Sequence, residues 1–176
     1  MNALARKSRL HVCSLARIDE AVAETGARSL VTLLNRGTPV TRPAAIRPER
    51  HLFIAMSDIV ETMDGHILPG ENHVRDLLAF VGAWDRAEPL LIHCFAGVSR
   101  STAAAFIAAC ALDPARRESE IAQAIRAASP TATPNARLVA AADAVLGRAG
   151  RMSEAIEAIG RGETCAVGVP FALEVG

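Results

Sequence analysis

Short apolar runs alternate with amphipathic segments in the first part of the chain. Residues 9–15 and 28–35 have the length and apolar content of buried strands. Residues 18–25 between them are predicted to form a short helix that ends at Gly26. Residues 36–50 hold three prolines and four arginines, and this composition favours a surface loop. The order of these elements is that of a β-α-β unit.

A long connection follows the next predicted strand. Residues 51–56 have a strand pattern, and residues 71–84 are predicted as a helix with one apolar face. The connection between them is rich in turns and carries Asp58 and Asp64. A long connection inside a compact domain is often a functional loop.

The remainder of the chain is predicted to hold one more strand and then only helices. Residues 89–94 are almost wholly apolar after Pro89, as expected for a central strand covered on both faces. The tail beyond residue 160 has no clear periodicity. We predict helices over residues 100–112, over residues 118–128, from Pro134 to Gly147 with Thr133 as N-cap, and over residues 152–160.

This order of elements predicts an α/β fold. We expect a central, mostly parallel sheet of about four to five strands, flanked by helices and closed by a C-terminal helical cluster. The chain has 176 residues, of which 51% are hydrophobic, and this is enough for one domain with a full core.

Charge and hydropathy exclude several classes of function. The formal net charge is zero, so no field of the whole molecule attracts nucleic acid or an anionic membrane. The longest apolar segments are shorter than the ~18 residues of a spanning helix. The basic N-terminus lacks an apolar stretch followed by a cleavage site. We therefore expect a soluble, cytoplasmic protein that needs neither a nucleic-acid nor a membrane partner.

The four cysteines argue against a zinc site and against a disulfide framework. They lie far apart and form no C-x-x-C pair. The histidines show no ligand spacing with a carboxylate or a thiol. We expect reduced thiols and no metal or other cofactor.

The sequence "HCFAGVSRS" of residues 93–101 places a cysteine where a strand ends and an arginine where a helix begins. A loop wound between them turns its N–H groups inward at a helix N-terminus, and this arrangement stabilises an anion. Cys94 is then expected to be a thiolate nucleophile. Arg100 can hold two oxygens of a phosphate at once. Together the two residues indicate phosphoryl chemistry.

These residues resemble the signature of the cysteine-dependent protein tyrosine phosphatases, H-C-x-x-G-x-x-R followed by Ser or Thr. The resemblance implies that Cys94 is the nucleophile and that Ser101 helps the thiolate to leave. His93 is expected to hold the loop by hydrogen bonds. The residues implied in substrate binding are Phe95, Ala96, Gly97, Val98, Ser99 and Arg100.

The resemblance covers most of residues 10–148 and is greatest to the compact dual-specificity branch. "AMSDI" is similar to the loop that carries the general acid, which implies that role for Asp58. Asp64 is the alternative, although it precedes a glycine in a turn where aspartate is common for backbone reasons. "SPTATPN" is similar to the segment in which Asn135 helps to fix the helical cluster.

The domain boundaries follow from the extent of the resemblance. Residues 1–150 are expected to form a tyrosine-phosphatase-like domain. Residues 151–176 resemble nothing in the family, and we expect a C-terminal helix and tail packed on the same domain.

The implied activity is hydrolysis of phosphomonoesters through a cysteinyl-phosphate intermediate, most favourably on phosphotyrosine in proteins or peptides. Two alternatives remain: a rhodanese-like sulfurtransferase and a module that binds phosphotyrosine without turnover. The loop interior "FAGVS" carries no cation, and this disfavours phosphoinositides as substrates.

Overall fold

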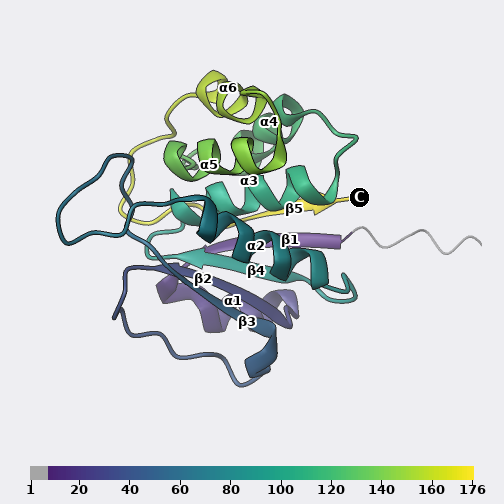
Figure 1. Cartoon of the computed structure of the whole chain (residues 1–176). Coiled ribbons are helices and arrows are strands. Elements are labelled where there is room, and N and C mark those ends of the chain that lie inside the picture. The colour runs from purple at the N-terminus through teal and green to yellow at the C-terminus, as the bar shows by residue number, and fades with distance from the viewer. Residues whose placement is uncertain (1–7) are drawn as a thin grey trace, which may run out of the picture.

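The computed structural model describes residues 8–176, and its centre is a five-stranded sheet (Figure 1). The strands lie in the order β3-β2-β4-β1-β5. β1 to β4 run parallel, and β5 pairs antiparallel with β1. This confirms the mostly parallel sheet. The strands are β1 (Ser8–Ser14), β2 (Ser29–Leu34), β3 (His51–Ala55), β4 (Leu90–Cys94) and β5 (Phe171–Val175).

Helices cover the two faces of the sheet unequally. α1 (Ile18–Thr25) lies on one face, after the short 3-10 turn η1 (Leu15–Arg17), and a second turn, η2 (Pro48–Arg50), precedes β3. The helical cluster lies on the other face (Figure 1). No helix within residues 8–176 is long and apolar enough to cross a membrane. The cluster consists of α2 (Glu71–Ala83), α3 (Arg100–Leu112), α4 (Glu118–Ala128), α5 (Ala136–Leu146) and α6 (Arg151–Ile159).

The helix α3 is the centre of the larger core. Every residue from Arg100 to Cys110 is buried. A helix that is apolar on all sides is stable only inside a protein, and the alanine-rich sequence of α3 meets this condition. The sheet lies beneath α3 and the other helices surround it, so the N-terminus of α3 is held fixed against the end of β4.

The start of α5 differs from the prediction. Asn135, and not Thr133, is the N-cap, because its Oδ1 accepts a hydrogen bond from the Leu138 N–H at 3.0 Å. Thr133 is engaged elsewhere: its N–H donates to Val98 O at 2.9 Å. The helix therefore begins two residues later than its sequence indicates.

The tail contains a strand that the sequence reading missed. Phe171, Leu173 and Val175 in β5 are buried, while the residues between them are exposed. This alternation of period two places three apolar side chains in the larger core. The last residues of the chain thus cover the edge of β1.

Candidate active site

Cys94 lies at the end of β4, in the middle of the sheet edge where the parallel strands finish. We call residues 94–100 the cysteine loop. The Cys94 side chain is only 2% exposed. Its sulfur accepts a hydrogen bond from the Gly97 N–H at 3.3 Å and lies 3.1 Å from the Ser101 hydroxyl. The structure thus brings together three of the residues that the sequence singled out.

The cysteine loop is wound so that its carbonyl groups face outward. In a trans peptide the C=O and the following N–H point in opposite directions, so an anchored carbonyl fixes the N–H of the next residue inside the loop. Such a ring of N–H groups at a helix N-terminus attracts an anion. The anchors are Leu15 N–H to Phe95 O at 3.1 Å, Thr133 N–H to Val98 O at 2.9 Å and Asn135 N–H to Ser99 O at 3.1 Å.

Gly97 is required in this loop for two reasons. Its φ is +71°, a left-handed conformation that side chains disfavour. A Cβ at this position would also lie 2.9 Å from the carbonyl carbon of Cys13 and 3.0 Å from Ser14 N. The loop therefore packs backbone to backbone against the end of β1.

Arg100 is buried at the first turn of α3 and is held by the ends of two neighbouring strands. Its Nη1 donates to Asn35 Oδ1 at 2.7 Å and to Met56 O at 2.9 Å. Its Nε is buried and has no hydrogen-bond partner among residues 8–176. One edge of the guanidinium is thus fixed by protein, and the Nε edge is left for an anion.

Asn35 was not identified from the sequence. It follows β2 directly, and β2 is the neighbour of β4 in the sheet. The one signal in the sequence is that Asn35 directly follows a predicted strand. The ends of adjacent parallel strands meet at one edge of the sheet, so a polar residue there can reach the site.

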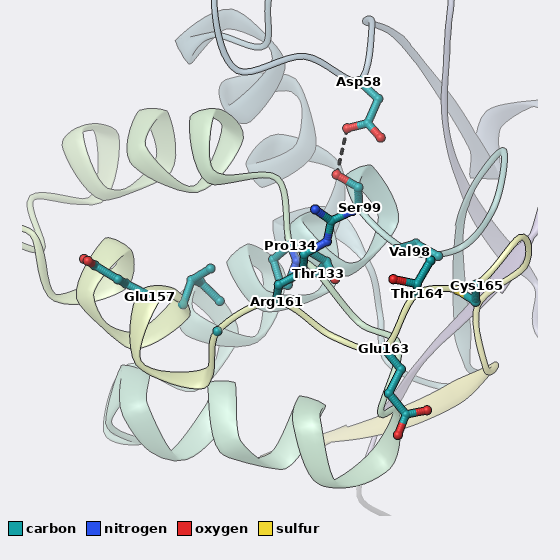
Figure 2. Close-up of a pocket in the computed structure, with 12 residues that line it drawn as sticks. Asp58, Val98, Ser99, Thr133, Pro134, Glu157, Arg161, Glu163, Thr164 and Cys165 are labelled. Carbon is teal, nitrogen blue, oxygen red and sulfur yellow. Dashed lines mark hydrogen bonds between the residues drawn. The ribbon is translucent and has the colours of Figure 1, made fainter.

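Asp58 is fixed directly to the cysteine loop. Its Oδ1 accepts a hydrogen bond from the Ser99 hydroxyl at 2.7 Å (Figure 2). The same oxygen accepts a second bond from Asn135 Nδ2 at 3.0 Å. Asn135 Nδ2 also donates to Ile59 O at 3.1 Å, so it holds the backbone after Asp58 as well. Asp64 is exposed, and within residues 8–176 no hydrogen bond joins it to the cysteine loop. Of these two aspartates, the structure joins Asp58 to the cysteine loop.

His93 belongs to a chain of polar groups beneath the loop. Its Nδ1 lies 3.1 Å from Cys94 O and must donate, because a carbonyl only accepts. Its Nε2 therefore accepts from the Thr32 hydroxyl at 2.7 Å, and His51 Nε2 donates to the same Thr32 oxygen at 2.7 Å. Burial lowers the pKa of His93 to about 4, so the ring is neutral near pH 7. His93 holds the strands in place and carries no charge.

Two of the other cysteines are buried thiols, and the third is partly buried. Burial raises the pKa of Cys13 and of Cys110 to about 12, so both remain thiols. Cys165 is partly buried in the C-terminal part of the chain. The described part of the chain holds no cluster of three or more His, Cys, Asp or Glu side chains that could bind a metal.

A pocket of about 550 Å³ opens beside Asp58 and the cysteine loop (Figure 2). Val98 and Ser99 form part of its wall. The chain after α6 also lines the pocket and contributes charged and polar side chains. These are Arg161, Glu163, Thr164 and Cys165.

This fold is that of the dual-specificity phosphatases. Human DUSP28 is similar at a TM-score of 0.59 and 20% identity, over 79% of this chain and 94% of that chain. DUSP15 is similar at a TM-score of 0.61 and 18% identity, over 85% of this chain and 90% of that chain. The PTP-2 phosphatase of Cydia pomonella is similar at a TM-score of 0.60 and 18% identity, over 77% of this chain and 84% of that chain. No protein-family model and no curated protein matches the sequence. At these identities the likeness establishes the fold.

Proposed function

We propose that this protein is a protein tyrosine phosphatase that hydrolyses phosphomonoesters through a cysteinyl-phosphate intermediate. The observation that carries the proposal is the environment of Cys94. The buried Cys94 sulfur accepts from the Gly97 N–H and lies 3.1 Å from the Ser101 hydroxyl, and the buried Nε of Arg100 has no hydrogen-bond partner among the described residues. A structural cysteine needs none of these partners.

In the first step, the Cys94 sulfur attacks phosphorus in line with the ester oxygen, and the P–O bond breaks. Arg100 holds two of the three non-bridging phosphoryl oxygens through its free edge, and the loop N–H groups donate to the phosphoryl oxygens as well. Asp58 gives its proton to the leaving oxygen. Its bonds to Ser99 and Asn135 keep the carboxyl beside the loop while this transfer takes place.

In the second step, water attacks the cysteinyl phosphate. Asp58, now a carboxylate, accepts the proton of that water, and the S–P bond breaks to release phosphate and the thiolate. The Ser101 hydroxyl, 3.1 Å from the sulfur, donates a hydrogen bond to the departing thiolate. Each residue then returns to its starting protonation state.

Phosphotyrosine in a protein or peptide is the substrate that the site supports best. Phe95 is 64% exposed beside the nucleophile and offers an aromatic surface to a phenyl ring. Residues 95–99 contain no basic side chain that would bind the further phosphates of an inositide. The reduced thiol that the reaction needs is consistent with a cytoplasmic location.

The test compares the Cys94→Ser and Cys110→Ala variants with the parent protein on a phosphotyrosine peptide. The serine variant should lose turnover by more than about a thousandfold and still bind inorganic phosphate, because the loop and Arg100 remain. The Cys110→Ala variant should stay within about twofold of the parent. Turnover by Cys94→Ser within tenfold of the parent would refute a covalent mechanism. Formation of thiocyanate from thiosulfate and cyanide would instead indicate a sulfurtransferase.

A further inference from the structure

The chain between α6 and β5 lies along the outer side of the cysteine loop. We call residues 160–170 the C-terminal segment. Three of its N–H groups bind the stretch that precedes α5: Gly162 donates to Thr133 Oγ1 at 3.0 Å, Glu163 to Pro130 O at 2.9 Å, and Val169 to Thr131 Oγ1 at 2.9 Å. A further N–H binds the cysteine loop itself, because Gly168 donates to Ala96 O at 2.8 Å. Figure 2 shows the segment beside Val98.

The bond from Gly168 adds Ala96 O to the anchored carbonyls of Phe95, Val98 and Ser99. Ala96 O belongs to the peptide group whose N–H is that of Gly97. Because this peptide is planar and trans, a carbonyl held by Gly168 directs the Gly97 N–H to the opposite side. That N–H is the one that lies 3.3 Å from the Cys94 sulfur. Gly168 therefore acts on the sulfur through a single peptide group.

Glycine is the only residue type that fits at position 168. A Cβ at position 168 would lie 2.5 Å from Gly97 O and 3.0 Å from Val98 Cγ2. The residue is buried, and its φ lies outside the left-handed range. Glycine is required here because two backbones touch, and not because of an unusual turn.

The segment is held firmly at both of its ends. α6 packs against α4 and α5, and β5 pairs with β1 over five residues. The buried side chains of β5 lie in the same core as Cys94. The N–H of Gly168 is thus presented to Ala96 by a segment that is attached to the fold at both ends and through the bonds of Gly162 and Val169.

We propose that Gly168 is a positioning residue of the active site, and that the C-terminal segment holds the cysteine loop in its active conformation. Its role is to orient the Ala96–Gly97 peptide so that the Gly97 N–H stabilises the thiolate and the bound phosphoryl group. This inference rests on the proposed phosphatase function for its chemistry, but its geometry concerns the sulfur alone.

The first test replaces Gly168 by alanine, with Val167→Ala as a control at an exposed position of the same segment. Iodoacetamide is added at pH 6 and at pH 9, and alkylation is measured on the Cys94 peptide. The measured quantity is the alkylation rate at pH 6 divided by the rate at pH 9. This ratio should be about tenfold lower in the Gly168→Ala variant than in the parent protein. This is the lower end of what a hydrogen bond to a charged group contributes. Vanadate should bind about tenfold more weakly, and Val167→Ala should match the parent.

A second variant removes the N–H without adding any atom. Residues 1–164 can be joined by chemical ligation at Cys165 to a synthetic peptide of the remaining chain. In this peptide an ester replaces the amide before Gly168. A matched protein carries the ester before Val169 and so loses the bond to Thr131 instead. The Gly168 ester should show the slowed alkylation at pH 6, and the Val169 ester should not.

The results separate the two proposals. Equal alkylation ratios and vanadate affinities in the two esters and the parent would overturn the role of Gly168. Alkylation is measured without turnover, so it remains informative if the parent hydrolyses no phosphate ester. A protein without phosphatase activity that still shows the ester effect would refute the proposed function and keep the positioning role.

Discussion

Asn135 joins two functions that substitution can separate. Its Oδ1 caps α5, and its Nδ2 donates to Asp58 Oδ1 and to Ile59 O. Alanine at this position removes all three hydrogen bonds. A lost N-cap costs about 1 kcal/mol, and each of the other two bonds contributes about 0.5–1.5 kcal/mol. We expect the free energy of unfolding to fall by about 2–4 kcal/mol and Tm to fall by roughly 5–15 °C.

The kinetic effect should depend on the leaving group. Without Asn135, Asp58 keeps only its bond to Ser99, and proton donation becomes less well aligned. The kcat on a phosphotyrosine peptide should fall by about tenfold, because a tyrosine oxygen needs the proton. The kcat on an aryl phosphate with an acidic phenol should change by less than about twofold, since that oxygen departs unprotonated.

The variant Asn135→Ser provides the control. A serine hydroxyl can still cap α5 but cannot donate to both Asp58 and Ile59, so it should recover about 1 kcal/mol of stability without recovering the kcat. Thermal unfolding and steady-state kinetics on the two substrates measure the two effects. Equal losses of kcat on both substrates, or recovery of kcat by serine, would refute the assignment of Asn135 to the proton donor.

Three further predictions concern other groups of the site. Asp58→Asn should lose about 10²–10⁴-fold in kcat on a phosphotyrosine peptide and lose the basic limb of the pH profile. Asp64→Asn should do neither, and the reverse result would move the acid to Asp64. Ser101→Ala should slow breakdown of the cysteinyl phosphate more than its formation, so rapid kinetics should show a burst of phenol, and equal slowing without a burst would contradict this role. Burial lowers the pKa of His93 from the ordinary 6.5 to about 4 in the folded protein. The contribution of neutral His93 to the free energy of unfolding is therefore fully present above about pH 6.5. That stability should fall by about 3 kcal/mol as the pH drops to about 4. Urea unfolding of the parent and of His93→Gln across this pH range measures the loss. An equal change of the free energy of unfolding with pH in the two proteins would contradict the prediction.

The parts of the fold that periodicity controls could be predicted from the sequence. The strand β4 and the helix α3 stand out because a short apolar run and an alanine-rich apolar helix have no stable place outside a core. The cysteine loop between them was predictable for another reason. Cys94, Gly97 and Arg100 follow one another closely along the chain, so their spacing alone determines that they meet.

The missed features depend on contacts between distant parts of the chain. Thr133 is a good N-cap by local rules, but its N–H binds Val98 and its hydroxyl accepts from Gly162, so Asn135 takes the role. Asn35 and Gly168 carry no local pattern at all. Their importance comes from Arg100 and Ala96, which are 65 and 72 positions away along the sequence.

The strand β5 has a consequence for the order in which the site can form. The cysteine loop is anchored on one side by Leu15, close to the start of the chain, and on another by Gly168, close to its end. During synthesis, domains acquire structure from the N-terminus as the chain emerges. A nascent chain that already contains Cys94, Arg100 and Asp58 still lacks the strand that covers β1 and the last anchor of the loop. The thiol should reach the environment described here only after Gly168 and β5 have been synthesised and have folded onto β1, so chains that stop before Gly168 should show the slowed alkylation of Cys94 at pH 6.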